Sequence, residues 1–61
     1  MLTDEQLNEI AVDLDDLLVL QRAGTPNYAR AKALMARLHT GGQNQVAWNA
    51  LVAKSGQLQT G

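Results

Sequence analysis

The sequence contains no cysteine and almost no aromatic residues, and both absences limit what the chain can be. Without cysteine it has no disulfide, no thiolate nucleophile and no cysteine-based zinc site. Tyr28 and Trp48 are the only aromatic residues, and alanine accounts for much of the 46% hydrophobic content. A 61-residue chain with such small core side chains is marginally stable on its own. We therefore expect self-association, as a homodimer or a larger homo-oligomer.

A secretion signal and a long hydrophobic run are also missing. The opening residues MLTDEQ lack a basic segment followed by an apolar one. No apolar stretch approaches the roughly 18 residues of a membrane span. We expect a cytoplasmic protein with no membrane partner.

Acidic residues are absent from most of the chain, and basic residues are absent from its beginning. All six acidic residues lie before residue 17, and all five basic residues lie after residue 21. The first 21 residues thus carry −6 and the remainder +5. These charges can neutralise each other within one molecule or between copies.

The first predicted helix covers about residues 3–23. Thr3 and Gln6 have the spacing of a capping box, and Gly24 supplies the stop. One face of this helix is apolar and forms the main core stripe: Leu7, Ile10, Ala11, Leu14, Leu17 and Leu18. Glu5, Glu9, Asp13 and Asp16 lie on the opposite side, and Val12, Val19 and Ala23 form a second, narrower apolar line. Two apolar stripes on one helix suggest two packing partners.

The second predicted helix covers about residues 26–39, with Thr25 as N-cap and Pro26 as its first residue. Gly41 or Gly42 ends it. Its predicted core face consists of Tyr28, Ala31, Leu34, Met35 and Leu38, and its back face of Ala29, Ala33 and Ala36. The basic edges are Arg30 with Arg37 and Lys32 with His39.

The third predicted helix covers about residues 43–54 and is followed by a flexible tail, 57–61. It is apolar nearly all round, which is typical of a buried helix, and a 61-residue monomer has little with which to bury it. The fold class is therefore all-α, a small three-helix unit with a long helix, a medium helix antiparallel to it and a short apolar helix, assembled as a homo-oligomer.

Catalytic groups are scarce. His39 is the only histidine, and no serine precedes Ser55, so a catalytic triad has no components in register. The carboxylates of the first helix share one convex surface, whereas helical metal sites need ligands that converge from several helices. We expect no enzymatic activity, no cofactor and no metal site.

Two binding functions stay open as alternatives. The order of Ala36, a glycine turn, Val46 and Trp48 is similar to a degenerate helix-turn-helix, although the reading helix has no arginine and DNA attraction would be weak. Nucleic acid is therefore not the expected partner. Alternatively, a phosphorylated, nucleotide-like small ligand is expected at the turn before the third helix, bound by Arg37, His39, Gly41, Gly42 and Gln43.

The main functional hypothesis is a non-enzymatic interaction protein that binds itself and also modulates or inhibits a larger partner protein. Small accessory factors of phage or plasmid type have this character. The expected partner-binding residues are Glu9, Val12, Asp13, Val19, Arg30, Arg37 and Trp48.

Overall fold

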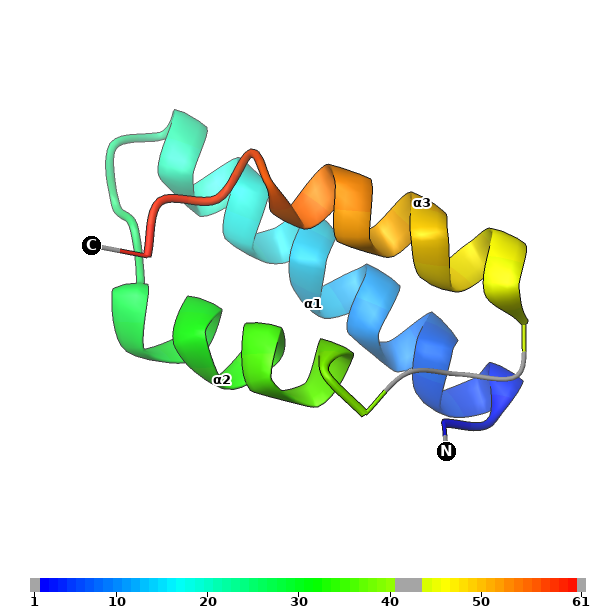
Figure 1. The fold of residues 1–61 in the computed structure, drawn as a ribbon. Coiled ribbons are helices and arrows are strands. Elements are labelled where there is room, and N and C mark those ends of the chain that lie inside the picture. Colours follow the sequence, from blue (N-terminus) through cyan, green and yellow to red (C-terminus); the bar gives the residue numbers. More distant parts are fainter. Residues whose placement is uncertain (1, 41–43, 61) are drawn as a thin grey trace.

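The computed structural model describes residues 2–40 and 44–60, and over these ranges the chain forms three helices and no strand. They are α1 (Asp4–Arg22), α2 (Tyr28–Leu38) and α3 (Gln45–Ser55). α2 runs back along α1, and α3 packs against both α1 and α2 (Figure 1). The expected all-α three-helix unit is confirmed.

The beginning of α1 is fixed by the capping box that the sequence predicts. The Gln6 backbone N–H donates to Thr3 Oγ1 at 3.2 Å, and the Thr3 N–H donates to Gln6 Oε1 at 2.8 Å. At the other end Gly24 has φ +82°, a left-handed conformation that glycine adopts without a Cβ penalty. The long helix therefore has a defined start and a defined stop.

α2 begins two residues later than the sequence suggests. Asn27 is its N-cap, because the Asn27 side chain accepts a 3.0 Å hydrogen bond from the Arg30 backbone N–H. The expectation that Thr25 caps this helix and that Pro26 is its first residue is therefore wrong. Both residues belong to the connection that follows α1.

The core is made of nine buried hydrophobic residues from all three helices. Seven are leucines, joined by Ile10 and Ala31: Leu7, Leu14, Leu17, Leu18, Leu34, Leu38 and Leu51. The predicted stripe of α1 is confirmed, with Ala11 only partly buried. Tyr28 is a correction, since it is 41% exposed. At about 100° per residue it lies at the edge of the stripe formed by Ala31, Leu34 and Leu38, where its large ring reaches solvent.

α3 is buried on one side only, although its composition predicts a buried helix. Leu51 and Ser55 face the core and Trp48 is half-buried against it, whereas Val46 is 81% exposed. The outward side carries small residues, Ala50 and Ala53. The whole chain exposes 3965 Å², close to the roughly 3,900 Å² expected for a folded monomer of 6.6 kDa. One chain thus closes its own core.

The tail after α3 packs back on the helices, although we expected residues 57–61 to be flexible. Gln21 Nε2 donates to the Gln57 carbonyl at 2.9 Å, and the Gln59 N–H donates to Gln21 Oε1 at 2.8 Å. Leu58, between them, packs against the core. The side-chain amide of Gln21 therefore binds the tail through both its nitrogen and its oxygen. Gln21 and Gln57 are 36 residues apart, so no local sequence pattern indicates this contact.

Candidate functional site

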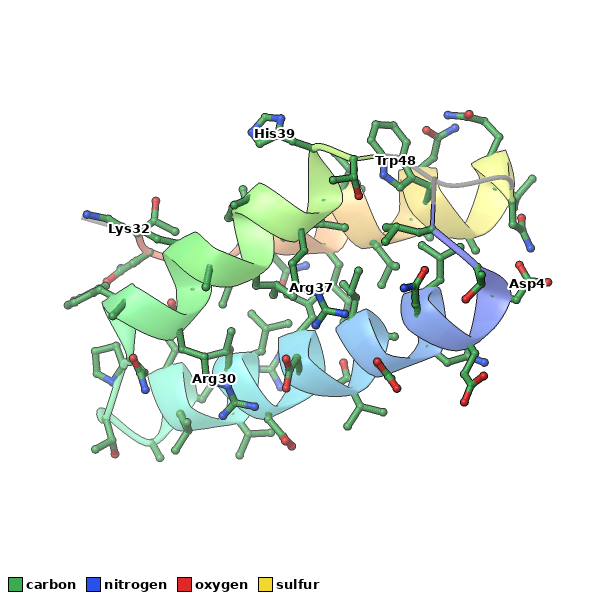
Figure 2. The ribbon with its side chains drawn as sticks, turned by 90° about the horizontal axis from the view of Figure 1, so that it is seen from below. Asp4, Arg30, Lys32, Arg37, His39 and Trp48 are labelled. Atoms are coloured by element: carbon green, nitrogen blue, oxygen red, sulfur yellow. The ribbon has the colours of Figure 1, made fainter. Side chains whose placement is uncertain are left out.

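Six of the seven expected partner-binding residues lie together on α1 and the neighbouring edge of α2. Glu9, Val12, Asp13 and Val19 belong to α1, and Arg30 and Arg37 reach them from α2 (Figure 2). Trp48 is on α3 and takes no part in this surface. The arrangement has two components, a network of ion pairs and an exposed apolar face.

The ion-pair network alternates three carboxylates with two guanidinium groups along the seam between α1 and α2. Arg30 Nη2 lies 2.5 Å from Asp13 Oδ1 and 3.9 Å from Asp16 Oδ2. Arg37 is 3.8 Å from Glu9 Oε2 and 3.9 Å from Asp13 Oδ2. Asp13 is the central member, since both arginines contact it. The division of charge along the sequence is thus used within one molecule.

This network relieves the repulsion that the sequence implies along α1. Glu9 with Asp13 is a like-charge pair one helical turn apart, which destabilises an isolated helix. In the fold, Arg37 bridges these two carboxylates. The side chains of the network are 37% to 63% exposed, so each pair contributes modestly to stability and is screened by salt. The network links α1 to α2 along their seam.

Beside the network lies the apolar part of the surface, which we call the valine face. It consists of Val12 and Val19, two turns apart on α1 and 62% and 61% exposed. At about 100° per residue both point away from the core, with the carboxylates of Glu5, Glu9 and Asp16 beside them. Val12 and Val19 of the predicted second apolar line thus form a solvent-facing stripe, and Ala23, its third member, is the exposed C-cap residue of α1.

A shallow depression joins the two components. It has a volume of about 530 Å³ and is lined by Glu5, Asn8, Glu9, Val12, Asp13 and Arg37. Its walls carry three carboxylates and a single guanidinium, so it favours a cationic or neutral group over an anion. Arg37, which we expected to help bind a phosphorylated ligand, instead contacts Glu9 and Asp13.

The other expected ligand residues divide between two regions. Gly41, Gly42 and Gln43 lie outside the described residues. His39 lines a different groove, between α2 and α3, on the side of α2 away from α1 (Figure 2). Arg37 and His39 are therefore directed to different surfaces.

Trp48 has a structural position. Its indole N–H donates a 2.9 Å hydrogen bond to the Leu38 carbonyl at the end of α2, and the side chain packs against the core. No local sequence pattern predicted this contact. The outward side of α3, which a helix-turn-helix protein would present to DNA, carries Val46, Asn49, Ala50 and Ala53. It has no cation free to contact phosphate, since Lys54 pairs with Asp15.

Neither a metal cluster nor a membrane-spanning helix occurs within residues 2–40 and 44–60. No group of three or more potential ligand side chains converges there, and no helix there is both long enough and apolar enough to cross a bilayer. Compared with protein-family models, with curated proteins and with solved structures, the chain gave no match.

Proposed function

We propose that this chain is a non-enzymatic interaction protein that assembles with itself and binds and modulates a larger partner protein, using the valine face of α1 as its docking surface. The observation that carries the proposal is the exposure of Val12 and Val19 at the centre of a carboxylate-lined helix face. Apolar side chains surrounded by charge are the arrangement of a docking surface with a central anchor and a polar rim.

The ion-pair network supports this proposal by orienting part of the surface. Arg30 and Arg37 of α2 lie 3.9 Å and 3.8 Å from Asp16 and Glu9, two of the carboxylates beside the valines, before a partner arrives. A preorganised surface loses less conformational entropy on binding. The complementary partner surface is an apolar groove with basic edges.

Site-specific photo-crosslinking in the native cells tests the proposal. A photoreactive amino acid at position 12 is compared with the same amino acid at position 46, because Val46 is even more exposed than Val12 and lies on α3. We expect position 12 to yield discrete protein adducts, including one with a different and larger protein, well above the yield at position 46. Equal yields at the two positions, or no protein adduct at position 12, would contradict the proposal.

A further inference from the structure

A second apolar surface lies between α2 and α3, on the far side of the molecule from the valine face. It is lined by Met35, Leu38, His39, Trp48, Val52 and Ser55, and its volume is about 130 Å³. We call it the α2–α3 groove. An apolar cavity of about 150 Å³ accommodates a benzene-sized group, so this groove has room for one small aliphatic side chain.

The polar groups of the groove leave its apolar surface available. The Ser55 hydroxyl donates to the Val52 carbonyl at 2.7 Å, and the Trp48 N–H is bound to the Leu38 carbonyl. Ser55 and Trp48 therefore present no unsatisfied polar atom to an incoming aliphatic side chain, and the imidazole of His39 lies at the groove as its remaining polar group. Met35, half-buried at the groove, adds a flexible side chain that adapts to the shape of an occupant.

The charge around the groove has one sign. α2 and α3 contain no acidic residue, and Lys32 lies one turn before Met35 on the same edge of α2 as His39 (Figure 2). The other cations of these helices, Arg30, Arg37 and Lys54, already pair with carboxylates of α1. Lys32 does not line the groove but lies on the adjoining edge of α2, where neither α2 nor α3 supplies a carboxylate to oppose an acidic partner surface.

The chain itself carries a surface with the matching properties. The valine face presents small aliphatic side chains, and Glu5, Glu9 and Asp16 beside them provide negative charge. Both surfaces are present in every copy. They lie on opposite sides of the molecule, because α1 is on one side and the groove residues His39 and Trp48 are on the other (Figure 2).

We infer that the α2–α3 groove of one copy receives the valine face of a second copy, with Lys32 beside the incoming carboxylates. The inference rests on the proposed function, because it names a second copy as a partner of the valine face. Opposite placement of the two surfaces makes the contact head-to-tail, which gives a ring if the rotation closes and an open chain if it does not. Assembly then covers the face that binds the larger partner, so the two events compete.

Mixing two variants of the purified protein, each with one surface disabled, tests the inference. Val12→Lys disables the valine face and adds favourable i,i+4 pairing with Asp16, so α1 stays folded. Val52→Glu disables the groove, and Ala53→Glu is its control because Ala53 lies on the outward side of the same helix. Lys32→Glu is a second groove variant at an exposed position.

The readout is native mass spectrometry with size-exclusion light scattering. We expect the wild type and Ala53→Glu to form oligomers, and each disabled variant alone to be monomeric. An equimolar mixture of Val12→Lys with Val52→Glu, or with Lys32→Glu, should form a one-to-one heterodimer, because one intact surface of each kind remains.

Two results would overturn the inference. One is a wild type that stays monomeric at high micromolar concentration, and the other is an oligomeric wild type whose variant mixtures give no heterodimer. Either result leaves crosslinking of position 12 to a different protein unaffected, so failure of the head-to-tail contact is distinguishable from failure of the valine face to bind a larger partner.

Discussion

The indole N–H of Trp48 donates a 2.9 Å hydrogen bond to the carbonyl of Leu38, and this bond joins the first half of α3 to the last turn of α2. The last carbonyls of a helix have no partner within the helix. Trp48 satisfies one of them across the connection between α2 and α3, and its ring covers part of the core beside it.

Replacing Trp48 should therefore separate the hydrogen bond from the packing of the ring. We expect Trp48→Phe to lower the free energy of unfolding by about 1 kcal/mol, the usual value of one such bond. Trp48→Ala also removes the ring and should cost about 3 kcal/mol. Urea denaturation followed by circular dichroism measures both. Equal effects of the two substitutions would show that the ring contributes nothing beyond its N–H.

Asn27 and Thr25 provide a direct test of where α2 begins. Because the Asn27 side chain accepts a bond from the Arg30 N–H, Asn27→Ala should destabilise the fold by about 1 kcal/mol. Thr25→Ala is the matched control and should change the free energy of unfolding by less than about 0.5 kcal/mol. A larger loss at Thr25 than at Asn27 would place the helix start where the sequence pattern alone puts it.

The ion-pair network predicts a coupling that depends on salt. In a double-mutant cycle of Arg30→Met and Asp13→Asn, we expect a coupling energy of up to about 1 kcal/mol at low ionic strength. It should fall in about 1 M salt, where the Debye length is near 3 Å. Lys32→Met is the control, since no acidic partner lies within ion-pair distance of Lys32 among the described residues. A coupling unchanged by salt would mean that the pair acts through packing.

The tail contact depends on the side chain of Gln21 but not on the side chains of Gln57 and Gln59, so substitutions at these positions should differ in their effect on amide exchange. Gln21→Ala removes both hydrogen bonds to the tail, so backbone amides after residue 56 should exchange with deuterium faster. The double variant Gln57→Ala and Gln59→Ala should leave exchange nearly unchanged, because both bonds use backbone atoms of these residues. Faster exchange in the double variant, but not in Gln21→Ala, would show that the two hydrogen bonds of Gln21 do not fix the tail.

Features of this fold that involve only neighbouring residues could be predicted from the sequence, and features that depend on contacts between helices could not. The capping box at Thr3, the stripe from Leu7 to Leu18 and the stop at Gly24 all involve neighbouring residues, and all were predicted correctly. The start of α2 was missed because Thr25–Pro26 and Asn27 offer competing local signals. Two contacts depend on how the helices pack, which the periodicity of the sequence does not specify. They are the hydrogen bonds of Gln21 to the tail and the hydrogen bond of Trp48 to Leu38.

For the candidate site, helical spacing grouped the residues of α1 and the basic edge of α2, but it did not show how their charges are used or that Trp48 lies apart from them. The second apolar line and the basic edge of α2 were visible in the helical spacing. That Arg30 and Arg37 neutralise the carboxylates of their own α1, rather than those of another copy, followed only from the crossing of the two helices. The α2–α3 groove was not foreseen, because it forms between side chains of two different helices, whose packing the spacing within one helix does not specify.

The most direct test of the interaction role is a native mass spectrum of the protein purified gently from its own cells, with Val12→Lys and Val46→Lys beside it. The wild type and Val46→Lys should carry additional protein mass, as further copies or a larger partner, and Val12→Lys should lose it. A wild type with the mass of a single chain would contradict the account. A wild type that is a single chain with one small ligand of a few hundred daltons would also contradict the account, if Val12→Lys keeps the same ligand.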